Sequence, residues 1–177
     1  MDLIPTEGSV RFFGSHIRTN DRNSVADLRR TIGVLRKEAQ FLDHLPVGDN
    51  IALPLHVCGV GTDLRAGDLR ALLEWVDLDR RADVLPAELT TGERQRAALA
   101  RAVILSPEVI LCDEPTGSVD WDAALRLLEL LVELNRMGKA VMIATHNPNL
   151  IRAVENQVAV RVLHLTGGRI EAAETHD

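Results

Sequence analysis

Two apolar stretches of the sequence end in side chains that can bind a metal ion or a phosphate. The run VILC (109–112) leads directly into Asp113 and Glu114, and the run AVMIAT (140–145) leads into His146. One carboxylate suits Mg²⁺, which prefers oxygen ligands and retains bound water. A second carboxylate can orient or deprotonate an attacking water, and an imidazole can hydrogen-bond a terminal phosphate. Together these residues predict nucleoside triphosphate hydrolysis, whereas the two acids alone also fit the ordinary start of a loop.

The segments on either side of these acids carry further signals. Thr90 is followed three residues later by Glu93, a capping-box pattern that predicts a helix running to about residue 105. After Glu114, the turn PTGS leads to a third acid, Asp120, which can help to shape the site of a partner chain. The three acids, the imidazole and the capped helix therefore form one candidate site.

The elements that must position this site can be read from apolar spacing. We expect strands at 9–14, 31–36, 109–112 and 140–145, helices at 68–78, 121–138 and 148–155, a loop at 59–67, and a hairpin around the TGG turn at 166–168. Pro46 and Pro54 are expected to break any long helix within 41–57. Apolar strands alternating with helices predict an α/β fold with a mostly parallel sheet covered on both faces. Ligands bind at the carboxyl ends of such strands, where Asp113 and His146 follow.

The composition fits a single soluble globular domain. The chain has 177 residues, 46% hydrophobic and 26% charged, with a net charge of −6 that argues against a nucleic-acid partner. Cys58 and Cys112 lie far apart with no CxxC pattern, so they predict free thiols rather than a disulfide or zinc site. No apolar run is long enough to span a bilayer.

Four motifs in this order resemble the nucleotide-binding domain of the ABC ATPases. LTTGE (89–93) resembles the signature motif, VILCDE (109–114) the Walker B strand and GSVD (117–120) the D-loop, and His146 lies at the position of the switch histidine. Within that family, the stretches IGVLRKEAQFLDHLPVGDNIALPL and EPTGSVD are most similar to the cell-division group of the FtsE type. The resemblance implies a P-loop NTPase-like ABC core over 1–177, with a helical signature subdomain inserted at about 58–105.

The resemblance also implies roles for individual residues. Asp113 is expected to hold Mg²⁺ through water, and Glu114 and His146 are expected to be catalytic. The signature residues bind ATP held by a neighbouring chain, Asp120 belongs to the D-loop and Lys37 occupies the Q-loop position. The signature residues are Thr90, Thr91, Gly92 and Glu93. ATP and Mg²⁺ are the expected cofactors.

The sequence departs from the family pattern at three places. It contains no GxxxxGK[ST] P-loop, and Met1–Ile4 align with the end of the helix that follows that loop, so the domain is interpreted as N-terminally truncated. Lys37 replaces the Q-loop glutamine, and Thr91 replaces a signature glycine. We therefore expect no ATPase activity from this chain alone, and unpaired edges on the strands that flank the missing one. Measured Mg²⁺-ATP turnover that Glu114→Gln abolishes would refute the first expectation.

The resemblance implies that partners complete the site. The expected partners are a second copy or an intact ABC ATPase subunit, together with an FtsX-like integral membrane protein that holds the chain at the inner face of the plasma membrane. A non-hydrolysing module that completes a partner's site, a subunit for lipoprotein release or efflux, and a misplaced start codon are the alternatives. Five apolar residues fit either a groove for a partner helix or simple core: Leu42, Leu45, Val47, Ile51 and Leu53.

Overall fold

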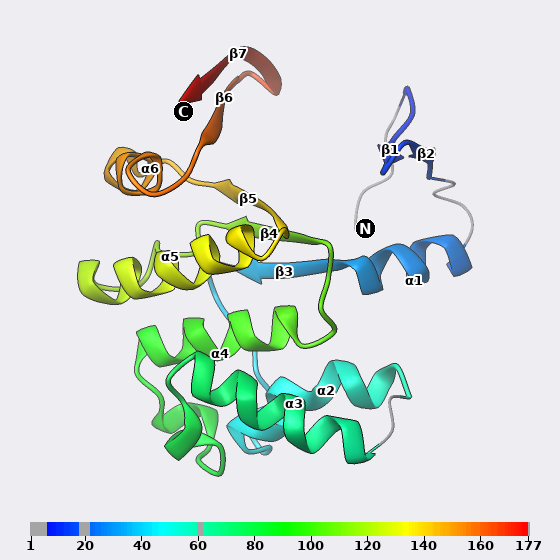
Figure 1. Ribbon diagram of the computed structural model, residues 1–177, viewed down its shortest axis with the longest axis vertical. Coiled ribbons are helices and arrows are strands. Elements are labelled where there is room, and N and C mark those ends of the chain that lie inside the picture. The colour runs from blue at the N-terminus through cyan, green and yellow to red at the C-terminus, as the bar shows by residue number, and fades with distance from the viewer. Residues whose placement is uncertain (1–6, 18–21, 60–61, 177) are drawn as a thin grey trace.

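The protein consists of a small parallel sheet, a helical layer on one side of it and two hairpins. The computed structural model describes residues 7–17, 22–59 and 62–176 (Figure 1). Its strands are β1 (Arg11–Phe12), β2 (Ser15–His16), β3 (Ile32–Arg36), β4 (Val109–Asp113), β5 (Ala140–Ala144), β6 (Val160–Thr166) and β7 (Arg169–His176). Its α-helices are α1 (Arg22–Thr31), α2 (Val47–Val57), α3 (Thr62–Trp75), α4 (Thr91–Val103), α5 (Trp121–Arg136) and α6 (Pro148–Glu155), and short 3₁₀ turns lie at Asp79–Arg81 and Pro86–Glu88.

The central sheet is three-stranded and parallel, in the order β3-β4-β5. Alternate residues of its strands, including Leu35 and Ile110, are fully buried against α4 and α5. The opposite face exposes Val34 by 50% and Met142 by 56%. The parallel sheet is confirmed, but the expected cover on both faces is present on one face only within the described residues. In that part of the chain β5 also pairs with β4 alone, which leaves its other edge unpaired.

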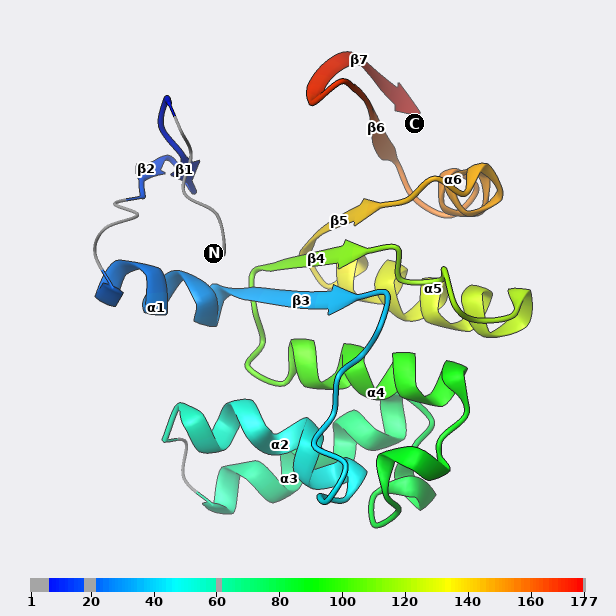
Figure 2. The same cartoon turned by 180° about the vertical axis from the view of Figure 1, so that it is seen from behind.

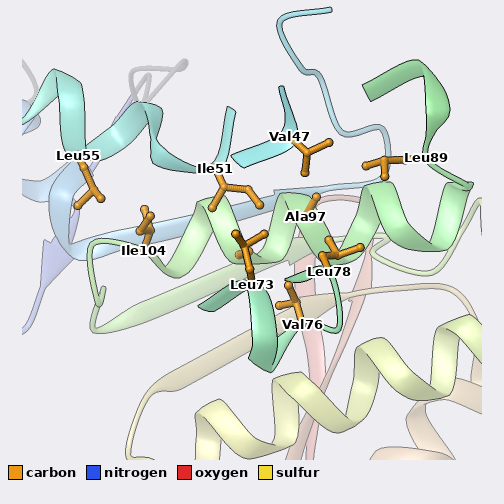
Figure 3. Close-up of a cluster of buried hydrophobic side chains, with 10 residues drawn as sticks. Val47, Ile51, Leu55, Leu73, Val76, Leu78, Leu89, Ala97 and Ile104 are labelled. Carbon is orange, nitrogen blue, oxygen red and sulfur yellow. The ribbon is translucent and has the colours of Figure 1, made fainter. Parts of the chain in front are cut away.

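Helix α4 joins the sheet to the helical layer, because both of its sides are buried. Leu99 packs with the strands, while Ala97 and Ile104 pack with α2 and α3 in a second cluster (Figure 3). Both views of the ribbon place α2 and α3 on the far side of α4 from the sheet (Figures 1 and 2). Val47 and Ile51 are fully buried in this cluster, so core is their role, whereas Leu42 remains 44% exposed. Full burial of one such aliphatic side chain contributes about 1.5–3 kcal/mol.

The predicted helix boundaries near the site are confirmed. Thr90 caps α4, and Glu93 completes the capping box by accepting from the Thr90 backbone N–H. Helix α5 ends just before Gly138, whose φ of 89° is the left-handed value that glycine adopts without strain. These boundaries fix where the loops of the candidate site begin.

Two sequence expectations about the helical layer are wrong. Pro54 lies inside α2, because the burial of α2 against α4 outweighs the local cost of an interior proline. Asn50, which is fully buried, donates to the carbonyls of Leu42 and Leu45 and anchors the helix start. Helix α3 begins at Thr62, within the stretch 59–67 that was expected to be a loop. The expected strand at 9–14 is shorter, β1, and turns directly into β2. Met1–Ile4 lie outside the described residues.

Candidate functional site

Glu114 and His146 meet at the carboxyl ends of β4 and β5. The parallel register pairs Asp113 with Ala144, so the residues that follow each strand emerge at the same edge of the sheet. His146 Nδ1 lies 2.6 Å from Glu114 Oε1, and the His146 backbone N–H donates to the same oxygen at 2.9 Å. The Thr145 hydroxyl donates to Glu114 Oε2 at 3.2 Å. Both carboxylate oxygens are therefore held by the end of β5.

The backbone of Glu114 is also unusual. Its φ is 44°, a left-handed value that a residue with a side chain adopts at a cost of about 1–3 kcal/mol. Its N–H donates to the Ala144 carbonyl at 2.9 Å, which holds this conformation. Partial burial raises the pKa of the Glu114 carboxyl, but the hydrogen bonds from His146 and Thr145 outweigh it and the net pKa lies below the ordinary value. The Glu114 carboxylate is therefore ionised near neutral pH, and the hydrogen bonds from His146 and Thr145 fix its orientation.

Asp113 is the last residue of β4, and it is exposed. In the described part of the chain no group of three or more His, Cys, Asp and Glu side chains is placed to hold a metal ion. Mg²⁺ usually takes one or two carboxylates and fills its other positions with water and phosphate oxygens. An exposed carboxylate at this edge fits that pattern, so Asp113 can hold Mg²⁺ only together with a bound phosphate and water.

The signature and D-loop residues line one groove of about 510 Å³. The starts of α4 and α5 converge there, because Thr90 caps α4 and Asp120 caps α5 by accepting from the Ala123 N–H at 2.8 Å. Thr91 and Ser118 line this groove and also the adjoining one. The N-terminal ends of helices favour anions. The two helix starts therefore direct backbone N–H groups toward this groove, beside the Glu93 and Asp120 carboxylates.

Gly92 is required by the packing of α4 on α5. An idealised Cβ at this position would lie 2.9 Å from the Ala123 Cβ, a distance that real Cβ atoms do not adopt. Thr91 is exposed and adds its β-branched side chain to both grooves where the family pattern has a second glycine. The fold thus demands glycine at 92 and tolerates threonine at 91.

Lys37 follows β3 and lies beside the turn after Glu114. Its Cε and Cδ are 3.0 and 3.3 Å from the position of an idealised Cβ on Gly117. Its carbonyl accepts from Gln95 Nε2 at 2.6 Å. Lys37 shares a groove of about 600 Å³ with Thr91, Gln95 and Ser118. The Q-loop position and the signature helix are thus connected within one chain.

The structure gathers the predicted residues in three groups. Glu114 contacts His146, and the signature residues share a groove with Asp120. Lys37 contacts the turn between these two groups. The side chain of Asp113, at the end of β4, makes no hydrogen bond or ion pair within the described residues.

Sequence reasoning missed three residues that hold the site: Thr145, Gly117 and Gln95. Gln95 is 2% exposed, and its side chain donates to the carbonyls of Arg36 and Lys37. Its place four residues before the buried Leu99 on α4 was the available signal, because a polar side chain on an apolar helical face needs a partner.

Comparison with known proteins places the chain in a family. The ABC transporter family matches residues 1–117. The cell division ATP-binding protein FtsE of Mycobacterium tuberculosis (strain ATCC 25618 / H37Rv) is 37% identical over 166 residues, which cover 94% of this chain and 70% of that protein. FtsE of Escherichia coli (strain K12) is 36% identical over 173 residues, covering 98% and 76%.

A second kind of relative differs in length. The methionine import ATP-binding protein MetN 2 of Burkholderia mallei (strain ATCC 23344) is 40% identical over 157 residues, which cover 88% of this chain. The chain spans only 40% of the length of that protein. Both kinds of relative are named as ATP-binding proteins, so the comparison supports the shared ATP-binding domain and not one transported substrate.

Solved structures agree with this assignment. The dimeric, post-hydrolysis structure of the ATP-binding cassette MJ0796, bound to ADP and Pi, superposes with a TM-score of 0.84 at 30% identity, covering 98% of this chain and 75% of that one. CbiO1 of Clostridium perfringens, part of the ABC transporter complex cbiONQ, has the same TM-score at 23% identity, covers 97% and 67%, and supports the fold alone. None of the helices in the described residues has the length and apolar character needed to cross a membrane. From its fold, its motifs and these matches, the chain belongs to the ABC transporter ATP-binding family.

Proposed function

We propose that the chain is an FtsE-like ATP-binding subunit that couples ATP to an FtsX-like integral membrane protein in cell division. The observation that carries this proposal is the pair of sites within one chain. Glu114 and His146 are in contact at the ends of β4 and β5, and the signature residues share a groove with Asp120. A chain with both features can share a nucleotide site with a neighbouring subunit.

The side chains suggest a division of roles. Asp113 holds Mg²⁺ through water, Glu114 orients or deprotonates the attacking water, and His146 donates to the terminal phosphate. Bound Mg²⁺ supplies positive charge against the phosphates. The signature groove, from Thr90 to Glu93, covers ATP that another subunit holds on its P-loop, and Asp120 positions that interface.

The division role is proposed over methionine import because the stretches IGVLRKEAQFLDHLPVGDNIALPL and EPTGSVD are most similar to the FtsE type. The FtsE proteins align with 94% and 98% of this chain and are themselves covered by 70% and 76%. We further propose that about 58–105 forms the helical signature unit and that a membrane partner holds the chain at the inner face of the plasma membrane.

Nucleotide-dependent association with an intact FtsE-like ABC subunit tests the proposal. The tagged chain should retain that subunit when Mg²⁺-ATP is present and lose it when ADP replaces ATP. Glu114→Gln should prolong the association, because water attack is slowed while binding is kept. The same complex should co-purify with an FtsX-like membrane protein in detergent. Equal association with and without nucleotide would contradict the proposed ATP-driven contact.

A second function has its own supporting observation. Thr91 and Lys37 depart from the family pattern. These features favour a non-hydrolysing module that completes the site of a P-loop subunit. ATP turnover by a mixture of this chain and an intact ABC subunit decides between the two functions. If Glu114→Gln in this chain leaves the turnover unchanged, the chain lends only its signature groove. If that variant lowers it, Glu114 takes part in hydrolysis.

A further inference from the structure

We propose that Lys37 is a phosphate-binding residue, which places an ammonium group against the terminal phosphate of a nucleoside triphosphate and so reduces the dependence of binding on Mg²⁺. This inference rests on the proposed nucleotide site and adds a residue whose type differs from the family's glutamine. Glutamine offers an acceptor to a metal-bound water, but lysine carries three donors and a positive charge. A glutamine therefore favours the metal-bound nucleotide, whereas a lysine favours the nucleotide without a metal.

The backbone of Lys37 is fixed from the signature helix. Gln95, which is 2% exposed, donates from Nε2 to the Lys37 carbonyl at 2.6 Å and to the Arg36 carbonyl at 3.3 Å. Its other amide atom, Oε1, is buried and has no partner in the described residues. Leaving a buried amide without its hydrogen bonds costs free energy. The hydrogen bonds from Gln95 Nε2 to the two carbonyls are therefore maintained. Lys37 consequently leaves the sheet at a defined point.

The side chain of Lys37 is also directed by a glycine. Gly117 provides an open surface over which Lys37 Cδ and Cε lie, and an idealised Cβ there would approach Cε to 3.0 Å. Gly117 belongs to the turn that Glu114 opens, because its N–H donates to the Glu114 carbonyl at 3.0 Å. The ammonium, one bond beyond Cε, is thus held close to the turn that follows the Walker B acids.

The charge of Lys37 is available to a ligand. Lys37 is exposed, and no carboxylate of the described residues lies within 4.0 Å of its ammonium. Glu114, the acid at the head of the neighbouring turn, is engaged by His146 and Thr145 instead. Lysine is a compact point charge, and it binds phosphate in that form. An unpaired cation at the edge of the sheet where nucleotide phosphates are expected has a phosphate oxygen as its natural partner.

The amino-acid composition provides a direct test. Lys37 and Lys139 are the only lysines in the chain. Lys139 is a matched internal control, because it lies before β5, at the opposite end of the strands, and its ammonium binds the Ser106 carbonyl and Glu108. With ¹³C-labelled lysine, each ammonium reports separately by NMR. The full chain is titrated with ATP without metal, with Mg²⁺-ATP, with tripolyphosphate and with adenosine.

We expect the Lys37 Cε signal to shift saturably with metal-free ATP and with tripolyphosphate, while the Lys139 signal and the adenosine titration show no change. Lys37→Gln should weaken metal-free ATP binding about tenfold, the loss of one charge-assisted hydrogen bond, and should weaken Mg²⁺-ATP binding less. An unmoved Lys37 signal, or equal shifts of the two lysines, would overturn the proposal.

Gly117→Ala tests the positioning without removing the charge. The added methyl group must displace the flexible end of Lys37, so ATP binding should fall several-fold while the thermal unfolding midpoint changes little. Unchanged binding in this variant would overturn the role assigned to Gly117. The proposed function is judged separately: if the Lys37→Gln chain still associates with an ABC subunit in Mg²⁺-ATP while the Lys37 signal never moves, that function stands and this inference fails.

Discussion

His146 and Glu114 are joined by two contacts to a single carboxylate oxygen. The ring nitrogen Nδ1 lies 2.6 Å from Glu114 Oε1, and the His146 backbone N–H donates to the same atom at 2.9 Å. Thr145 donates to the second oxygen. The direction of the Glu114 carboxylate is therefore set by the residues that follow β5 as well as by its own strand. Any change at the end of β5 should alter the candidate catalytic acid.

Thr145→Val tests how strongly β5 holds this carboxylate. The variant keeps the shape of the side chain but removes the donor to Glu114 Oε2 and the acceptor that serves the Asn147 N–H at 3.1 Å. We expect the free energy of unfolding to fall by about 1–2 kcal/mol, the usual range for lost hydrogen bonds at a partly buried site. Urea unfolding measures it.

Thr166→Val is the matched control, because Thr166 is exposed at the end of β6 and its hydroxyl makes no hydrogen bond in the described residues. It should change the unfolding free energy by less than about 0.5 kcal/mol. Equal effects of the two variants would mean that the Thr145 hydroxyl does not hold Glu114.

Gly92 offers a second prediction, which separates packing from ligand binding. Gly92→Ala places a Cβ 2.9 Å from the Ala123 Cβ and should destabilise the protein by about 1–3 kcal/mol through overpacking. Ala123→Gly alone should cost about 1 kcal/mol, because glycine is unfavourable in a helix. In the double variant the clash disappears, so the two effects should be less than additive.

A double-mutant cycle of unfolding free energies measures this coupling. Additive losses would show that α4 and α5 do not meet through these two residues. A coupled cycle would show that the signature glycine is needed by the fold itself, whatever ligand the groove receives.

These residues also show what the sequence alone can predict. The capping box of Thr90 and Glu93 and the end of α5 at Gly138 depend on neighbours a few residues away, and both were predicted correctly. Pro54 was misplaced because the burial of α2 against α4 outweighs the local cost of an interior proline.

Contacts between segments that are distant in sequence could be found only in the folded structure. Thr145 reaches Glu114 because β4 and β5 pair in parallel, and Lys37 reaches Gly117 because β3 and β4 do. No local pattern marks either pair. The sequence motifs therefore predicted the acids and the histidine as site residues, but not the residues that hold them in place.

The two cysteines should differ in reactivity. Burial raises the pKa of the Cys112 thiol to about 12, and the residue is 3% exposed, so it should be almost entirely protonated and inaccessible at about pH 8. Cys58 is partly exposed at the end of α2 and is also a free thiol. A thiol-specific chromogenic reagent should label one cysteine quickly in the native chain and the second only in denaturant. Fast labelling that persists in Cys58→Ser would contradict the burial of Cys112.

The capping box at the signature helix should make stability depend on pH. The pKa of Glu93 is lowered, first by the hydrogen bond from the Thr90 backbone N–H, with burial opposing it and with the Thr90 hydroxyl, Arg81 and Arg96 adding to it. A carboxyl whose folded pKa lies below its unfolded value of 4.5 stabilises the fold above that pH, and this contribution is lost as the pH falls through the folded pKa. Glu93→Gln should therefore destabilise the chain near neutral pH, and its difference from the wild type should shrink below about pH 4.5.

This prediction is tested by measuring unfolding free energies between about pH 3 and pH 7 for the wild type, Glu93→Gln and Glu129→Gln. The side chain of Glu129 is exposed on α5 and makes no hydrogen bond or ion pair within the described residues, so its variant should follow the wild-type curve throughout. Thr90→Ala should cost about 1 kcal/mol near neutral pH and flatten the pH dependence as well, because the cap and the box share their hydrogen bonds. If Glu93→Gln ran parallel to the wild type down to the lowest pH, the ionised carboxylate would not be what stabilises the start of α4. The start of α4 would then be held by the Thr90 hydroxyl, which accepts from the Glu93 N–H at 3.2 Å.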